Sequence, residues 1–177
     1  GSWRFEYGKL MGGAIMNVTK PPFDNKKLRL AVNLALDRKS GAQILYNGRA
    51  QPALYQSQDW TWARTPEEIW DKVPGWGTGA KKQQEIEQAK QLMKDAGLGG
   101  GLSVIQNGAN WEDYHILLNE WMSPQLGRIG INTQIKLLDR GPFTPKMASL
   151  DYAVSAYIFG YAQSDPDEFL GAYFITG

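Results

Sequence analysis

The feature that most constrains the fold is an almost continuous apolar run at residues 153–159, in which Ser155 is the one polar residue. A run of aromatic, aliphatic and β-branched residues of this length predicts a strand buried on both faces of a helix-covered sheet. A loop at residues 160–164 follows it, and the motif DPDE at 165–168 then provides the capping chemistry with which helices begin. Because ligands gather outside the carboxyl ends of strands in open α/β sheets, this loop is the first candidate site.

Helix and strand patterns alternate along the rest of the chain. Helices are predicted at 25–37, 39–46, 67–72, 81–96, 111–126 and 142–150, and further strands at 13–18, 102–106 and 131–138. The strand, helix and strand of residues 102–138 form a βαβ unit, which should be right-handed. The alternating strand 131–138 is typical of a sheet edge. We therefore predict an α/β fold with a mixed, mostly parallel sheet flanked by helices.

A long irregular segment at residues 49–80 interrupts this alternation and contains four of the seven tryptophans. Trp60 and Trp62 are two residues apart, so in an extended backbone they point the same way. Such a pair can stack on a sugar ring or a planar ligand, or it can pin the segment to the domain. Both interpretations stay open, with packing slightly favoured.

Composition excludes several classes of protein. The chain has 19 Lys plus Arg against 18 Asp plus Glu, so no basic surface for nucleic acid is indicated. It contains no cysteine, which excludes disulfides, thiolate catalysis and Cys-ligated zinc. The single histidine, His115, is placed in a solvent-facing or half-buried position of a helix. We expect no metal, no cofactor and no partner nucleic acid.

Candidate ligand contacts are the polar residues that follow two of the predicted strands. Tyr161, Gln163 and Ser164 follow the central strand, while Asn107 and Asn110 follow strand 102–106. A binding pocket needs neutral donors and acceptors of this kind, although a plain surface loop would also contain them. Asn110 is in addition the predicted N-cap of helix 111–126.

Three carboxylates near the end of the chain, Asp165, Asp167 and Glu168, suggest acid–base catalysis at first sight. All three lie in the first turn of a predicted helix, where capping and the helix dipole explain them. We therefore favour capping over catalysis.

Five stretches resemble the extracellular solute-binding proteins, family 5, of peptide/nickel-type ABC importers. They are PPFDNKKLRLAVNLALDRK (21–39), YNGRAQPA (46–53), EQAKQLMKDAG (87–97), LGRIGIN (126–132) and FGYAQSDPDEFL (159–170). They occur in the order found in that family and span nearly the whole chain.

The resemblance implies a two-lobed receptor of the type II binding-protein fold that closes on a small-molecule ligand. It implies delivery to ABC permease subunits in the membrane, a periplasmic or extracellular location (free or lipid-anchored), a monomer and no enzymatic activity. Residues 1–177 are expected to form a single periplasmic-binding-protein-like lobe, the second large lobe of the receptor. Expected ligands are a peptide, an oligosaccharide or an opine-like compound.

Peptide-binding members of this family place charged anchors where this chain has alanine. Ala162 occupies the position of an Asp that holds the amino terminus of the peptide, and Ala109 lies near an Arg that meets its carboxylate. The resemblance therefore favours neutral or hydroxyl-rich ligands over free di- and tripeptides. Two alternatives stay open, a sugar-acting hydrolase that uses Asp165 and a protein-interaction module that uses the Trp-rich segment.

Overall fold

A computed structural model describes residues 10–50, 52 and 63–160 of the chain. The strands are β1 (Leu10–Met16), β2 (Leu102–Ala109), β3 (Ile131–Leu138) and β4 (Val154–Gly160). The helices are α1 (Lys26–Ala35), α2 (Arg38–Tyr46), α3 (Pro66–Lys72), α4 (Gly79–Asp95), α5 (Asp113–Gly127) and α6 (Arg140–Ala148). Each element coincides with a predicted one, with boundaries that differ by a few residues.

The four strands form a single sheet in the order β1-β4-β2-β3. Strand β2 runs parallel to β3 and β4, whereas β1 runs antiparallel to β4. The prediction of a mixed, mostly parallel sheet is therefore confirmed. Strand β4 lies inside the sheet with Val154, Ser155 and Ala156 fully buried. Strand β3 lies at an edge, as its alternating pattern predicted.

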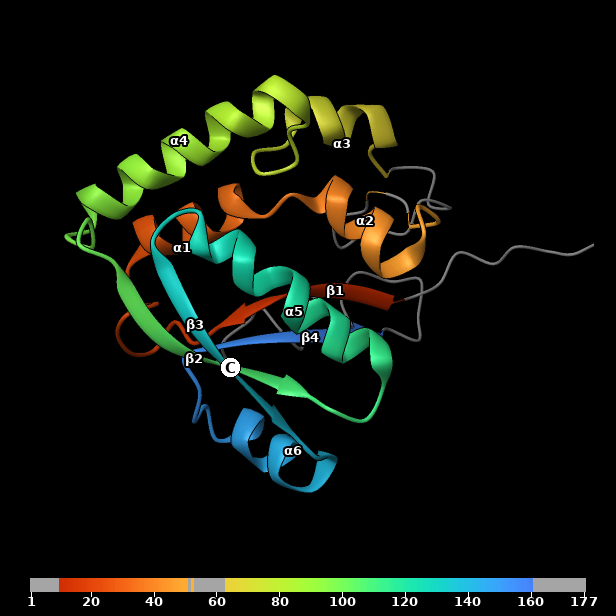
Figure 1. Ribbon diagram of the computed structural model, residues 1–177, viewed down its shortest axis with the longest axis vertical. Coiled ribbons are helices and arrows are strands. Elements are labelled where there is room, and N and C mark those ends of the chain that lie inside the picture. Colours follow the sequence, from red (N-terminus) through yellow and green to blue (C-terminus); the bar gives the residue numbers. More distant parts are fainter. Residues whose placement is uncertain (1–9, 51, 53–62, 161–177) are drawn as a thin grey trace, which may run out of the picture.

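Helices cover one face of this sheet in two layers. Figure 1 shows α5, α1 and α2 on this side, with α3 and α4 lying outside them, while α6 lies on the opposite side. Helix α5 packs on β2, β3 and β4, and α1 packs against α4. The core between these layers is apolar, and its largest fully buried side chains include Phe23, Leu28, Met93, Met122 and Leu126.

Local capping chemistry explains where several helices begin and end. At the start of α3, Thr65 is the N-cap and Pro66 is the first helical residue. Thr65 and Glu68 form the two reciprocal hydrogen bonds of a capping box. Asn47 is the C-cap that follows helix α2, and its φ of 51° lies in the left-handed region. Helix α1 begins one residue later than predicted, because Asn25 is the cap and its side chain accepts the Lys27 N–H.

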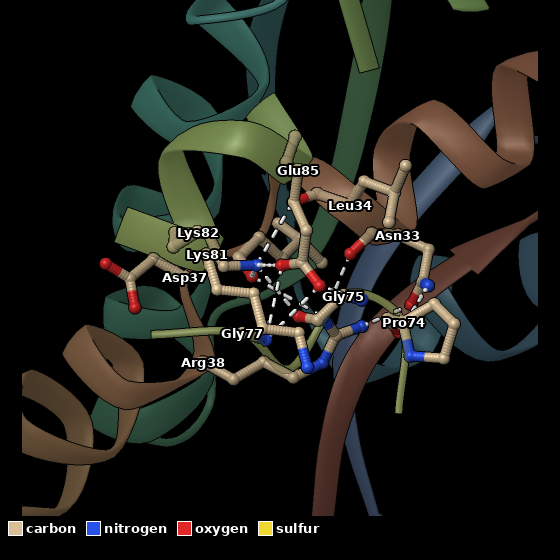
Figure 2. A network of polar contacts seen from close by, with 12 residues as sticks. Asn33, Leu34, Asp37, Arg38, Pro74, Gly75, Gly77, Lys81, Lys82 and Glu85 are labelled. Atoms are coloured by element: carbon tan, nitrogen blue, oxygen red, sulfur yellow. Dashed lines mark hydrogen bonds and ion pairs between the residues drawn. The ribbon is translucent and has the colours of Figure 1, made fainter. Parts of the chain in front are cut away.

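The end of the Trp-rich segment is ordered by a buried polar network (Figure 2). Lys82 of α4 lies 2.6 Å from Glu85, and Glu85 accepts the N–H groups of Gly75 and Gly77. Arg38 of α2 donates to the carbonyl of Gly75 and stacks over the ring of Trp76. Residues 73–79 are thus fixed to both α2 and α4, whereas the sequence indicated only an irregular connector.

Candidate functional site

The carboxyl ends of the three parallel strands meet at one edge of the sheet. Strand β2 ends at Ala109, β3 at Leu138 and β4 at Gly160. The loop that follows β4 begins at this same edge, as predicted. Its residues Tyr161, Gln163 and Ser164 lie outside the described part of the chain, as do Trp60, Trp62 and Asp165.

Strand β4 continues beyond its pairing with β2, and side chains of α5 form hydrogen bonds with its backbone there. The β2–β4 pairing extends only as far as Gly108 and Ala156. There Asn119 donates from Nδ2 to the Ala156 carbonyl at 3.0 Å, and the Ile158 N–H donates to Nδ1 of His115 at 3.4 Å. Helix α5 therefore takes over backbone bonds that a neighbouring strand would otherwise make.

His115 is a structural residue at the base of this edge. Its side chain is 2% exposed, so the prediction of a solvent-facing or half-buried position is wrong. Burial lowers the pKa of His115 below its usual value and outweighs the opposing influence of the Glu112 carboxylate. Because Nδ1 accepts a hydrogen bond, the neutral form with a proton on Nε2 fits this geometry.

An aromatic cluster stands above the histidine at the carboxyl edge. The ring of Tyr157 stacks on His115 at 4.7 Å with an interplanar angle of 3°. Trp111 presents edge-on contacts to His115 at 5.4 Å and to Phe143 of α6 at 5.2 Å. These contacts come from β4, α5 and α6, so the cluster fixes the relative positions of the elements that border the edge.

Polar groups surround this cluster. The guanidinium carbon of Arg140 lies 5.1 Å above the ring centroid of Trp111. Asn110 donates from Nδ2 to the Asp139 carboxylate at 2.7 Å, which joins the loop after β2 to the start of α6. The prediction that Asn110 caps α5 is therefore wrong. The N-cap position is held by Glu112, two residues later, which has an extended backbone and makes no side-chain capping bond.

Asn107 is close to the same edge but is buried. A Cβ on the next residue, Gly108, would come within 2.3 Å of Asn119 of α5, so Gly108 faces α5. By strand alternation Asn107 points to the opposite face, the face on which α6 lies. The hydroxyl of Ser155 donates to the backbone carbonyl of Asn107 at 2.9 Å. The side-chain Nδ2 of Asn107 is buried and has no hydrogen-bond partner among the described residues.

Strand β2 continues to Ala109, so the prediction that Asn107 lies in the loop after the strand is wrong, and only Asn110 follows the strand end. The structure adds Trp111 and Arg140, which sequence reasoning missed. Both follow a strand end by two residues, so the rule that singled out the asparagines would also have found them. In the described ranges no group of three or more His, Cys, Asp or Glu could hold a metal ion.

Solved structures of binding proteins share this fold. The dipeptide-binding protein of Pseudoalteromonas sp. SM9913, in complex with Met-Leu, is 23% identical with a TM-score of 0.72. It matches 90% of this chain and 30% of that one. The periplasmic binding protein DppA of Helicobacter pylori, in complex with the peptide STSA, is 21% identical with a TM-score of 0.72. It matches 93% of this chain and 30% of that one. The chain therefore has the fold of the periplasmic binding proteins.

Curated relatives agree with this assignment. The glutathione-binding protein GsiB of Pectobacterium atrosepticum is 27% identical over 129 residues, and that of Escherichia coli K12 is 28% identical over 129 residues. In both cases the match covers 71% of this chain, which spans only 22% of the length of the relative.

No helix in the described part of the chain is long and apolar enough to cross a membrane. The family model described as "Bacterial extracellular solute-binding proteins, family 5 Middle" matches residues 4–177. That family and its periplasmic relatives place the protein in the periplasm or outside the cell. The chain belongs to the bacterial extracellular solute-binding proteins of family 5.

Proposed function

We propose that this chain is one ligand-binding lobe of an ABC-importer receptor that captures a short peptide or a peptide conjugate. The observation that carries the proposal is the convergence of three strand ends, where Asn110, Trp111 and Arg140 stand on a rigid aromatic base. A binding site needs such a combination of apolar surface and a few fixed polar groups. Tyr161, Gln163 and Ser164 follow β4 in the sequence and are further proposed ligand contacts.

Peptides are the preferred ligand class because the similar proteins named above bind peptides. The curated relatives named above bind glutathione, which is itself a peptide, and the two structural neighbours hold peptides. An oligosaccharide or an opine-like compound, which the sequence favoured through Ala109 and Ala162, is less well supported. Ala109 is fully buried at the end of β2, so its side chain does not face a ligand.

The mechanism we propose is closure of two lobes around the ligand. Contacts from both lobes stabilise the closed state, and the population of that state governs delivery to the permease. In this scheme residues 1–177 act as a single lobe without enzymatic activity. A hydrolase based on Asp165 and an interaction module based on the Trp-rich segment are not favoured, because the family and its relatives are binding proteins.

The proposal is tested with the complete receptor that contains this chain. Native mass spectrometry of the purified receptor identifies a bound solute by its mass, and calorimetry then measures binding of glutathione and of Met-Leu. We expect a complex of 1:1 stoichiometry with at least one peptide and no turnover of it. Binding of sugars alone, or conversion of the ligand, would contradict the proposal.

Single substitutions then test the predicted contacts. Gln163→Ala and Asn110→Ala should each weaken binding by about 1 kcal/mol, the usual loss for one hydrogen bond. An unchanged affinity would remove that residue from the site.

A further inference from the structure

We propose that Arg140, supported by the ring of Trp111, binds a carboxylate group of the ligand. This inference rests on the proposed function and deepens it by naming the charged group that is recognised. The sequence offered no cation for this task, since Ala109 lies near the position where an arginine was sought. The structure supplies one from a different strand end.

The placement of the two residues is the first argument. Arg140 is the first residue of α6 and comes two positions after the end of β3, while Trp111 comes two positions after the end of β2. Strands β2 and β3 are parallel neighbours, so both residues stand at the edge where ligands of α/β proteins bind.

The geometry of the pair is the second argument. With its guanidinium carbon 5.1 Å above the ring centroid of Trp111, Arg140 rests on an aromatic face. Trp111 in turn is held by edge-on contacts with Phe143 and His115. An arginine stacked in this way is pre-organised, and its N–H groups lie in a fork whose geometry matches a carboxylate.

The unused donors of Arg140 are the third argument. Within the described ranges its guanidinium makes no hydrogen bond and no ion pair, although the carboxylate of Asp139 is its neighbour in sequence. That carboxylate instead accepts the hydrogen bond from Asn110 at 2.7 Å. Arg140 is thus kept exposed and charged, with its donors available to an incoming anion.

Acidic residues at the same edge restrict what kind of ligand fits. Glu112 and Asp113 begin α5 and are exposed, as is Asp139. Net charge therefore does not draw an anion to this edge, and recognition depends on the directed bonds of Arg140. A ligand that carries both a carboxylate and an ammonium group, as a free peptide does, matches both signs of charge.

The test compares a free carboxylate with its neutral amide. The complete receptor, as wild type and as Arg140→Gln, is titrated by calorimetry with Met-Leu and with Met-Leu amide, and with glutathione and its diethyl ester, in which both carboxylates are neutral. We expect Arg140→Gln to weaken binding of the free acids about tenfold or more and to leave the amide and ester nearly unchanged. Arg140→Lys keeps the charge but loses the forked arrangement of donors, so its affinity for the free acids should lie between those of wild type and Arg140→Gln.

A matched control removes a positive charge elsewhere. Lys94 is exposed near the end of α4, and Lys94→Gln should leave all four affinities within about twofold, since a distant surface charge is screened. Thermal unfolding of each variant confirms that the fold is intact.

The outcomes separate the inference from the proposed function. If wild type binds a peptide and Arg140→Gln binds it equally well, Arg140 is not the anchor and the proposed function stands. If the variant loses the acid and the amide to the same extent, Arg140 does not recognise the carboxylate, and the inference is again wrong. If wild type binds none of the four compounds, the peptide function fails and the inference fails with it.

Discussion

The ammonium group of Lys82 lies 2.6 Å from a carboxylate oxygen of Glu85, and their side chains are only 3% and 8% exposed. Both groups have further partners. Lys82 also donates to the carbonyls of Leu34, Leu36 and Gly75 at 2.9–3.1 Å. This complete set of bonds allows two charges to be buried, and it joins α4 to the end of α1 and to the loop before α4.

Loss of one partner of this pair should strongly destabilise the chain. Glu85→Gln leaves Lys82 buried without a countercharge, and we expect the free energy of unfolding to fall by about 3–5 kcal/mol. Urea unfolding followed by circular dichroism measures the change. The control is Glu87→Gln, which breaks an exposed pair with Lys90 and should change stability by less than about 1 kcal/mol. Equal effects of the two substitutions would contradict this role of the buried pair.

Gly75 allows the loop to approach α1 closely. Its φ is +86°, and a Cβ there would lie 2.6 Å from the carbonyl oxygen of Asn33. Gly79 also has a positive φ, of +55°, but a Cβ there would meet nothing within 4 Å. Gly79→Ala should therefore lower the free energy of unfolding by only about 1–2 kcal/mol, the energy of placing a residue with a Cβ in the left-handed conformation. Gly75→Ala should cost at least about 1 kcal/mol more, because it adds a backbone clash. Thermal unfolding of the two variants side by side measures the difference, and similar values would argue against the clash.

His115 should make stability depend on pH in a defined window. Burial lowers its pKa in the folded state, whereas in the unfolded chain the pKa is about 6.5. The unfolded state therefore takes up the proton first as the pH falls. The stabilisation is complete above about pH 6.5 and is lost as the pH falls from there toward the lower pKa of the folded state.

The measurement is the difference in unfolding free energy between wild type and His115→Gln. That difference should shrink between pH 7.5 and pH 5, and because the chain contains a single histidine no other imidazole contributes. A difference that stays constant over this range would show that His115 does not titrate with unfolding.

Asn119 should be among the polar residues most sensitive to substitution. It is fully buried, donates to the carbonyls of His115 and Ala156, and accepts a bond from Gln106 at 2.9 Å. Asn119→Leu keeps the size but leaves buried groups without partners, each worth about 1–3 kcal/mol. Asn110→Ala, which removes an exposed bond to Asp139, should stay within about 1 kcal/mol. Chemical denaturation compares the two, and a neutral Asn119→Leu would contradict the assignment.

The order of the helices and strands could be predicted because each element is encoded by a local pattern in the sequence. The apolar run of β4 indicated a buried strand, and the alternation in β3 indicated an edge. These signals depend on residues a few positions apart. Boundaries were less certain where two caps compete, as at Asp24 and Asn25 before α1.

The site was harder to predict because its contacts join distant segments. His115 looked exposed in the helical pattern, yet it is buried against β4, where the Ile158 N–H donates to it beyond the end of the β2–β4 pairing. The sequence did not single out Lys82 and Glu85, because only the folded loop at Gly75 and Gly77 supplies their partners. The stacking of Arg140 on Trp111 likewise arises from two strand ends that are neighbours only in the sheet.

The position of β4 between β1 and β2 has a consequence for synthesis. Among the described strands β1 is translated first, but its pairing partner β4 is translated last, with Met16 opposite Val154. A nascent chain must therefore carry β1 without a partner until nearly the whole segment has been translated. The sheet therefore stays incomplete for most of the translation of this segment. During that time it is a substrate for chaperones that bind emerging strands or keep polypeptides unfolded for secretion.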